Sequence, residues 1–422
     1  MPRFLLFIAM SIGLTVVASS SYAWNLHGFI DGRSGISLHQ NSGQRRAILN
    51  EVRAQLDLSH SNDWSVWQLR GDLVGDEAAG SHNLDLDSGQ GVVDVREANV
   101  LFYPHPLVDV KLGRQILTWG TGDLLFINDM FPKDWQSFFI GRDEEYLKAP
   151  SDAVLISLFP RFANIDIIFT PEFDADRYIS GERVSFWNPM LGRHSLRADE
   201  MHVDTRNNWG KDAEFSGRIY RNFAGYELAL YGYSGFWKSP NGYDLASARQ
   251  TFPRLRVFGA SARGNAGPGI LNIEGGYYDS YSDSAGTDPF IPNSEYRLLL
   301  GYEQELRRNL SMALQYYLEY LDDYANYSSN LPTGSVERDR ARHVVTLRLT
   351  QQALNQNLTL SLFAYWSPSD QDAYLRPNIK YKASDALSVY LGGNLFFGSH
   401  DETFFGQFEG NNNLYAGIRY SF

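Results

Sequence analysis

Apolar and polar residues alternate along most of this chain, and the alternation is clearest at its C-terminal end. Within segment 413–422 the even-numbered residues are all apolar, whereas Asn413, Arg419 and Ser421 between them are polar. Successive side chains of a β-strand point to opposite faces, so this segment is predicted to be a strand with one apolar and one hydrated face. Such a strand suits a membrane barrel, with lipid outside and water inside, or the edge of a soluble sandwich.

The same period of two residues predicts about eighteen strands and no helix longer than a few turns. Segment 310–320 is apolar at every second position from Leu310 to Tyr320, and segment 372–383 alternates apolar residues with Arg376, Asn378 and Lys380. The predicted strands are 25–38, 47–59, 64–74, 92–103, 107–118, 152–159, 163–170, 211–221, 225–235, 252–264, 269–279, 294–305, 309–321, 340–352, 356–366, 372–383, 386–397 and 412–422.

The connections between these strands alternate between short and long. Short links such as 59–63 and 103–106 alternate with longer polar links such as 75–91, 119–151 and 171–210. Transmembrane barrels have short turns on the periplasmic side and long loops outside. We therefore predict one all-β domain over 24–422, a transmembrane antiparallel β-barrel of about eighteen strands, with about sixteen as the alternative count.

The first residues, 1–23, have the pattern of a secretory signal peptide. Arg3 supplies the positive start, an apolar stretch covers 5–18, and small residues at 21–23 form a cleavage site. No later segment has the ~18 consecutive apolar residues that a membrane helix needs, so a bilayer-spanning form of this chain would be a closed barrel. We expect it in the outer membrane of a Gram-negative bacterium.

Composition argues against several classes of function. Cysteine is absent, which removes disulfides and thiol chemistry, and the 9 histidines are scattered without metal-site spacing. The acidic segment 85–89 departs from a calcium-loop signature and is interpreted as a solvated outer loop. The formal charge of −12 argues against nucleic-acid binding. We expect no enzyme activity, no metal and no cofactor.

The polar faces of the predicted strands would line the lumen. Charges of both signs there suit a water-filled pore, and the inward positions become mainly basic toward the C-terminus, which favours anions. The alternative is that these arginines are tied to Glu303, Glu305 and Glu319 and only hold the wall open. The predicted pore-lining residues are Arg53, Arg70, Arg96, Glu97, Arg114, Arg297, Arg342, Arg348, Arg376, Lys380 and Arg419.

The link 119–151 is too long for a simple turn and is rich in aromatic and charged residues. So many rings on a solvated loop tip would form an unusual exposed apolar patch. We therefore predict that it folds inward and narrows the channel, although packing on neighbouring outer loops is the alternative. The predicted constriction residues are Asp123, Phe126, Asp129, Phe131, Lys133, Trp135, Arg142 and Tyr146.

Two features resemble known outer-membrane proteins. The final strand, which ends on Phe422, resembles the C-terminal signal of bacterial outer-membrane barrels, and this implies the barrel assembly machinery and outer-membrane lipid as partners. The residues 96–98 (Arg-Glu-Ala), 113–115 (Gly-Arg-Gln) and 119–120 (Trp-Gly) resemble a pattern of Gram-negative outer-membrane porins of largely unassigned substrate, distantly similar to alginate-export porins. The resemblance implies a substrate-selective channel.

The motif also yields two local predictions. Glu97 and Arg114 are candidates for a cross-strand ion pair in the barrel wall. Arg114 shares its parity with Val110 and Leu112, so without a local irregularity it would face lipid, at a cost of ~2–4 kcal/mol in the middle of the membrane. We predict that Gly113 marks a bulge that turns Arg114 inward.

These observations favour a passive porin for small hydrophilic or amphipathic solutes, with anions preferred. Three alternatives from other classes remain at this point: a polysaccharide exporter, a barrel enzyme with a site at its rim, and an adhesin or scaffold that acts through the loops 171–210 and 322–339.

Overall fold

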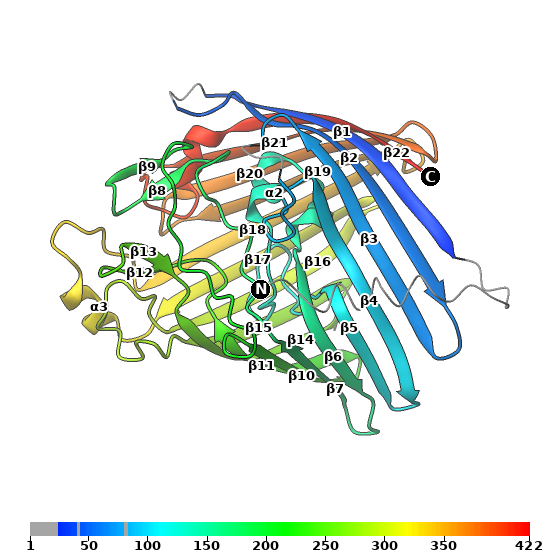
Figure 1. The fold of residues 1–422 in the computed structure, drawn as a ribbon, viewed down its shortest axis with the longest axis horizontal. Helices are drawn as coiled ribbons and strands as arrows, with labels where there is room; N and C mark the ends of the chain where they lie inside the picture. Colours follow the sequence, from blue (N-terminus) through cyan, green and yellow to red (C-terminus); the bar gives the residue numbers. More distant parts are fainter. Residues whose placement is uncertain (1–23, 40–42, 80–82) are drawn as a thin grey trace.

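The computed structural model describes residues 24–39, 43–79 and 83–422, and the predicted signal peptide at 1–23 lies outside them. A sheet of 18 antiparallel strands closes on itself (Figure 1). Closure is made by β1 (Asn25–Ser37), which pairs with β2 (Ala47–Ser61) on one side and with β22 (Asn413–Ser421) on the other. The predicted barrel is confirmed.

Each barrel strand pairs with the next one along the chain, and β7 pairs with β10 and β11 with β14 because short hairpins intervene. The predicted strand set is matched to within a few residues at each end, with the larger of the two predicted counts. The remaining barrel strands are β3 (Ser65–Asp76), β4 (Val93–His105), β5 (Val108–Ile116), β6 (Pro150–Leu158), β7 (Asn164–Thr170), β10 (Glu214–Phe223), β11 (Tyr226–Phe236), β14 (Arg254–Ala266), β15 (Gly269–Asp279), β16 (Glu295–Arg307), β17 (Leu310–Leu321), β18 (Ala341–Ala353), β19 (Leu358–Ser367), β20 (Asp372–Lys382) and β21 (Leu387–Gly398).

The outer surface of the barrel is apolar. On β16, Leu298 and Leu300 point outward and are exposed, whereas Leu299 between them is fully buried on the inside. Leu414, Ile418 and other apolar residues of β22 are exposed in the same way. An apolar band outside a closed sheet is the surface that a barrel presents to lipid. Within the described residues, no helix is long and apolar enough to cross a membrane.

The long connections carry short elements that the period-two pattern did not predict. These are the hairpin of β8 (Phe186–Asn188) and β9 (Arg193–Ser195), the hairpin of β12 (Gly242–Asp244) and β13 (Arg249–Thr251), and α3 (Tyr324–Asn330). All lie at one end of the barrel, opposite the short turns (Figure 1). Strands of three residues are too short to show a period, so the period-two pattern does not predict the two hairpins.

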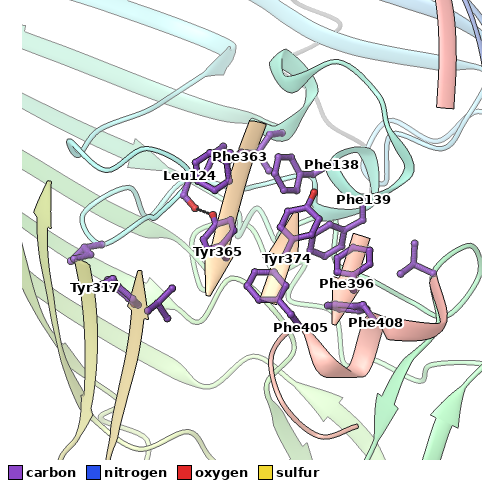
Figure 2. Close-up of a cluster of buried hydrophobic side chains, with 14 of the residues drawn as sticks. Leu124, Phe138, Phe139, Tyr317, Phe363, Tyr365, Tyr374, Phe396, Phe405 and Phe408 are labelled. Carbon is purple, nitrogen blue, oxygen red and sulfur yellow. Dashed lines mark hydrogen bonds between the residues drawn. The ribbon is translucent and has the colours of Figure 1, made fainter. Parts of the chain in front are cut away.

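The core of the molecule lies inside the barrel. The connection between β5 and β6, residues 117–149 and hereafter the inner loop, carries α2 (Trp135–Ile140) and the 3-10 helix η1 (Glu144–Leu147). Phe138 and Phe139 of α2 pack against Tyr374 and Phe396 from the wall, and the rings of Phe139 and Phe396 are 5.2 Å apart (Figure 2). The inward-facing aromatic residues of β19–β21 thus meet the loop instead of open water.

Candidate pore constriction

The first arm of the inner loop is fixed by a carboxylate on the wall. Glu274 of β15 is 1% exposed and accepts hydrogen bonds from the backbone N–H groups of Thr121 (2.6 Å), Gly122 (3.2 Å) and Asn128 (2.8 Å). The hydroxyl group of Tyr365 donates to the carbonyl oxygen of Leu124 (Figure 2). These contacts satisfy backbone groups that an irregular loop would otherwise leave unpaired inside the barrel.

The middle of the loop is a capped helix held by wall amides. Asp134 caps α2 by accepting from the N–H of Ser137 (2.7 Å), and the helix ends at Gly141, whose φ of 93° is left-handed. The amide groups of Asn394 and Asn413 donate to the carbonyl oxygen of Phe139, at 2.9 and 3.0 Å.

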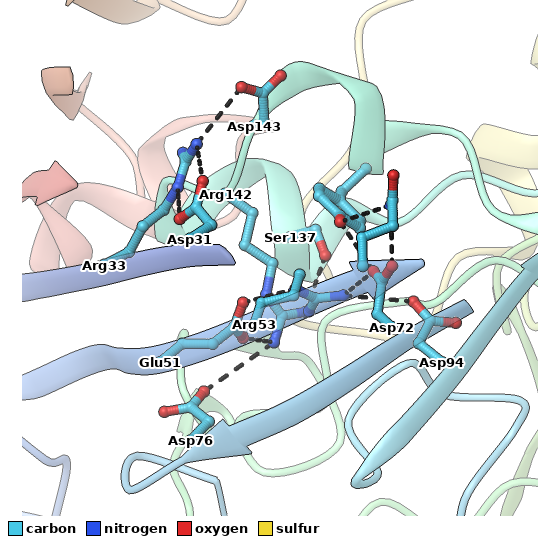
Figure 3. A network of polar contacts seen from close by, with 12 residues as sticks. Asp31, Arg33, Glu51, Arg53, Asp72, Asp76, Asp94, Ser137, Arg142 and Asp143 are labelled. Carbon is cyan, nitrogen blue, oxygen red and sulfur yellow. Dashed lines mark hydrogen bonds and ion pairs between the residues drawn. The ribbon is translucent and has the colours of Figure 1, made fainter. Parts of the chain in front are cut away.

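The last arm docks on β1–β3 through buried charges (Figure 3). Arg142 forms an ion pair with Glu51 (2.5 Å), and Arg53 lies between Glu51 (2.8 Å) and Asp72 (2.6 Å). The hydroxyl group of Tyr146 donates to Asp72 (2.8 Å), and burial raises the pKa of Tyr146 well above its ordinary value. Because each charge has its counter-charge, the arm can stay desolvated against the wall.

A second set of carboxylates on the loop faces the basic wall, defined here as Arg342, Arg348, Arg376, Lys380 and Arg419 of β18, β20 and β22. Arg348 pairs with Asp123 (2.6 Å) and with Glu144 (3.1 Å). The other pairs with the loop are Arg376–Glu144 (3.3 Å), Arg419–Glu145 (3.0 Å) and Arg419–Asp143 (3.7 Å). Carboxylates outside the loop form the pairs Arg419–Asp31 (2.8 Å), Arg342–Glu319 (3.2 Å) and Arg342–Asp370 (2.5 Å).

The environment shifts the pKa values of two carboxyl groups of this loop in opposite directions. Burial raises the pKa of Asp123 despite its contact with Arg348. Burial acts in the same direction on Asp143, but the guanidinium groups of Arg419 and Arg33 hold the pKa of Asp143 below its ordinary value.

Of the three wall carboxylates that the sequence suggested as partners of the basic residues, Glu319 pairs with the basic wall, whereas Glu303 lies 4.0 Å from Arg263. Most partners of the basic wall lie on the loop.

The predicted ion pair between Glu97 and Arg114 is wrong. Glu97 lies 3.3 Å from Arg70 and 3.8 Å from Lys111, and Arg114 pairs with Asp152 of β6 at 2.8 Å. The register explains the difference, because Arg114 lies opposite Ala98 on β4 and opposite Asp152 on β6. The β3–β4 register shifts beside Glu97, and this irregularity was not visible in the sequence.

Gly113 redirects Arg114 by its own backbone angle. Its φ is 111°, and a Cβ atom there would lie 2.3 Å from the carbonyl oxygen of Ala98. Arg114 is buried, so it avoids lipid as predicted, but the pairing of β5 stays one-to-one with β4 and β6 across Gly113. The predicted bulge at this position is therefore wrong, and a left-handed glycine without an inserted residue takes its place.

The other candidate residues lie on the inner side of the barrel or within the inner loop. Arg297 pairs with Glu295 (2.5 Å), and Lys133 pairs with Asp129 (3.0 Å) and lies 4.6 Å from the ring centre of Phe126. Phe131 packs on Trp119 with ring centres 5.1 Å apart. Trp135 donates its indole N–H to Asp176 (3.2 Å).

The sequence did not indicate the role of the next long connection, residues 171–213. Its Arg177 pairs with Asp94 of β4 (2.8 Å) and with Asp134 at the start of α2 (3.2 Å), and its Arg183 pairs with Asp76 of β3. Both guanidinium groups are buried. This connection therefore ties the inner loop to the wall, through contacts between two irregular segments that no periodic pattern predicts.

The same connection contains a carboxyl group with a strongly shifted pKa. Burial, together with the nearby carboxylates of Asp152 and Glu214, raises the pKa of Asp174 to about 8, against the opposing effect of Lys238 and Arg114. An acid whose pKa is raised by folding costs stability as the pH rises from its ordinary pKa to the raised one.

We therefore expect the thermal unfolding temperature to fall between about pH 5 and about pH 8, and Asp174→Asn to remove part of that fall. Asp204→Asn is the control, since Asp204 is an exposed carboxyl group of the same connection. Unfolding is followed by circular dichroism in detergent. Equal pH dependence in Asp174→Asn and the parent protein would reject the assignment.

A cavity of about 560 Å³ lies beside the inner loop, between it and the first strands. Its lining includes Trp119, Phe126 and Tyr146 of the loop and Gln55, Arg70 and Arg96 of the wall. Among the described residues, no group of three or more His, Asp or Glu side chains is placed to hold a metal.

No family model and no curated protein matches this chain. Solved structures do match: OccAB4 of Acinetobacter baumannii has a TM-score of 0.56 at 7% identity, over 95% of this chain and 99% of that chain. OccK11 (OpdR) of Pseudomonas aeruginosa has a TM-score of 0.53 at 9% identity, over 94% and 95%. OccAB1 of A. baumannii has a TM-score of 0.53 at 10% identity, over 94% and 96%. The chain has the fold of Gram-negative outer-membrane porins.

Proposed function

We propose that this protein is a passive outer-membrane channel for small hydrophilic or amphipathic solutes, with anions favoured. A barrel of 18 strands is wide enough for an aqueous lumen. The inner loop crosses that lumen and contacts wall residues on strands as far apart along the sheet as β2, β15 and β20. A solute would therefore pass the loop to cross the barrel, and the loop sets the size limit.

One observation carries the anion preference: the basic wall gathers five cationic side chains on nearby strands, Arg342, Arg348, Arg376, Lys380 and Arg419. Three of them, Arg348, Arg376 and Arg419, contact carboxylates of the inner loop. Arg348 is 25% exposed, so its guanidinium group is reached by water. Among the described residues Lys380 has no ion pair, and its ammonium group lies 5.3 Å from the ring centre of Tyr390. Basic groups along a pore lower the barrier for anions.

The test is the reversal potential of purified protein in a planar bilayer under a KCl gradient. We expect a reversal potential with the sign that an anion-selective channel produces. Arg348→Glu is expected to lower the chloride-to-potassium permeability ratio severalfold, because it reverses a charge beside Asp123 and Glu144. Arg193→Glu, an exposed arginine of the outer hairpin, is the control. Cation selectivity that Arg348→Glu leaves unchanged would contradict the charge preference while leaving the channel itself in place.

A further inference from the structure

The cavity beside the inner loop combines apolar walls with unevenly balanced charge. Trp119, Phe126 and Ile116 give it flat and apolar surfaces, and Thr118 and Thr121 add hydroxyl groups. Its volume of about 560 Å³ lies within the range of roughly 300–1,000 Å³ that is usual for small-molecule sites.

The four carboxylates that line this cavity already have cationic partners. These pairs are Asp123–Arg348 (2.6 Å), Asp129–Lys133 (3.0 Å), Glu144–Arg348 (3.1 Å) and Glu145–Arg419 (3.0 Å). The four pairs use three cations, because Arg348 contacts both Asp123 and Glu144, and Glu144 also lies 3.3 Å from Arg376. None of these cations lines the cavity. The acidic side chains thus leave little uncompensated negative charge for a solute to meet.

Two of the four cations of the lining, Lys148 and Arg96, are less well balanced by carboxylates, whereas Arg70 pairs with Asp57 (2.8 Å) and Arg263 lies 4.0 Å from Glu303. Lys148 has no ion pair within 4.0 Å among the described residues, although it lines the cavity and is half-buried. Arg96 lies 3.9 Å from Asp94, a carboxylate that Arg177 already holds at 2.8 Å. The guanidinium group of Arg96 also donates to the carbonyl oxygen of Lys148 (2.6 Å), so the two basic residues are adjacent.

We propose that this cavity is a binding subsite for small organic monoanions with a flat apolar body. The anionic group contacts the ammonium group of Lys148, with Arg96 behind it, and the apolar body lies against Trp119 and Phe126. A charge-assisted contact gives preference for the anion, and the rings give preference for the apolar body. The subsite rests on the proposed function, because a solute reaches it through the lumen.

Isothermal titration of the full-length protein in detergent tests the subsite, with benzoate, acetate and benzyl alcohol as probes. Benzoate is expected to bind about tenfold or more tightly than either acetate, which lacks the ring, or benzyl alcohol, which lacks the charge. Lys148→Met is expected to weaken benzoate about tenfold and leave benzyl alcohol unchanged, and Lys148→Arg to restore benzoate binding. Lys211→Met, an exposed loop lysine outside the cavity, is the control.

A second variant keeps the test independent of Lys148. Trp119→Leu removes the largest ring of the lining and is expected to weaken benzoate and benzyl alcohol alike. The subsite is rejected if benzoate binds no better than acetate, or if Lys148→Met binds benzoate like the parent protein. Conductance without benzoate binding would reject the subsite alone, and binding without conductance would reject the channel alone.

Discussion

Arg177→Met is expected to destabilise docking of the inner loop by about 3–5 kcal/mol, because it leaves buried carboxylates without their main counter-charge. The Arg177 side chain is 2% exposed and pairs with Asp94 and Asp134, whose side chains are both 1% exposed. Its backbone also bonds to the loop, since the N–H of Arg177 donates to the carbonyl oxygen of Lys133 (2.8 Å). Hydrogen exchange followed by mass spectrometry is expected to show faster exchange across 133–142.

Arg193→Met is the matched control, because Arg193 is an arginine of the same long connection that pairs with Asp199 at 2.7 Å but is 52% exposed. Exposed ion pairs contribute little to stability, so exchange in the inner loop is expected to remain as in the parent protein. If both variants behaved alike, Arg177 would not be the residue that holds α2 against the wall.

Glu274→Ala is expected to release the first arm of the inner loop. The carboxylate accepts hydrogen bonds from three backbone N–H groups. Its removal leaves the buried N–H of Asn128 without this partner, at a cost of about 1–3 kcal/mol, and the half-buried N–H groups of Thr121 and Gly122 lose theirs as well. Glu274→Gln retains one carbonyl acceptor and is expected to lie between the parent protein and Glu274→Ala. Single-channel recording is expected to show a larger and noisier open current for Glu274→Ala.

The control for this prediction is Glu303→Ala on the neighbouring strand β16. The side chain of Glu303 is 52% exposed and lies 4.0 Å from Arg263. Its removal therefore leaves no backbone N–H group of the inner loop without a hydrogen-bond partner. A quiet current of parental size from Glu274→Ala, with the barrel intact, would show that the arm is held by its other contacts.

The barrel strands were predictable because each strand carries its own signal. A strand of a two-sided wall alternates apolar and polar residues along most of its length, and the outward positions of β17 from Leu310 to Tyr320 are all apolar. The aromatic content of the inner loop likewise indicated burial, and Phe138 and Phe139 are 2% and 3% exposed in the structure. These properties depend on local composition and period alone.

The pairing of the charged residues was not predictable, because it depends on register and on contacts between distant segments. Arg114 pairs with Asp152 instead of Glu97 since the two residues face each other across β5 and β6. The partners of Arg177 lie 83 and 43 residues away in the chain. No spacing rule connects such positions, so the sequence identified many of the charges inside the barrel without identifying the partners of most.

The most direct test of the account is the single-channel conductance of the protein before and after deletion of 124–146. This deletion removes α2 and most of the contacts that cross the lumen while leaving β5 and β6 intact. We expect a conducting parent protein and a severalfold larger conductance for the shortened protein, because conductance rises with the open cross-section of a water-filled pore. Equal conductance in the two proteins, both folded as closed barrels, would contradict the claim that the inner loop narrows this channel.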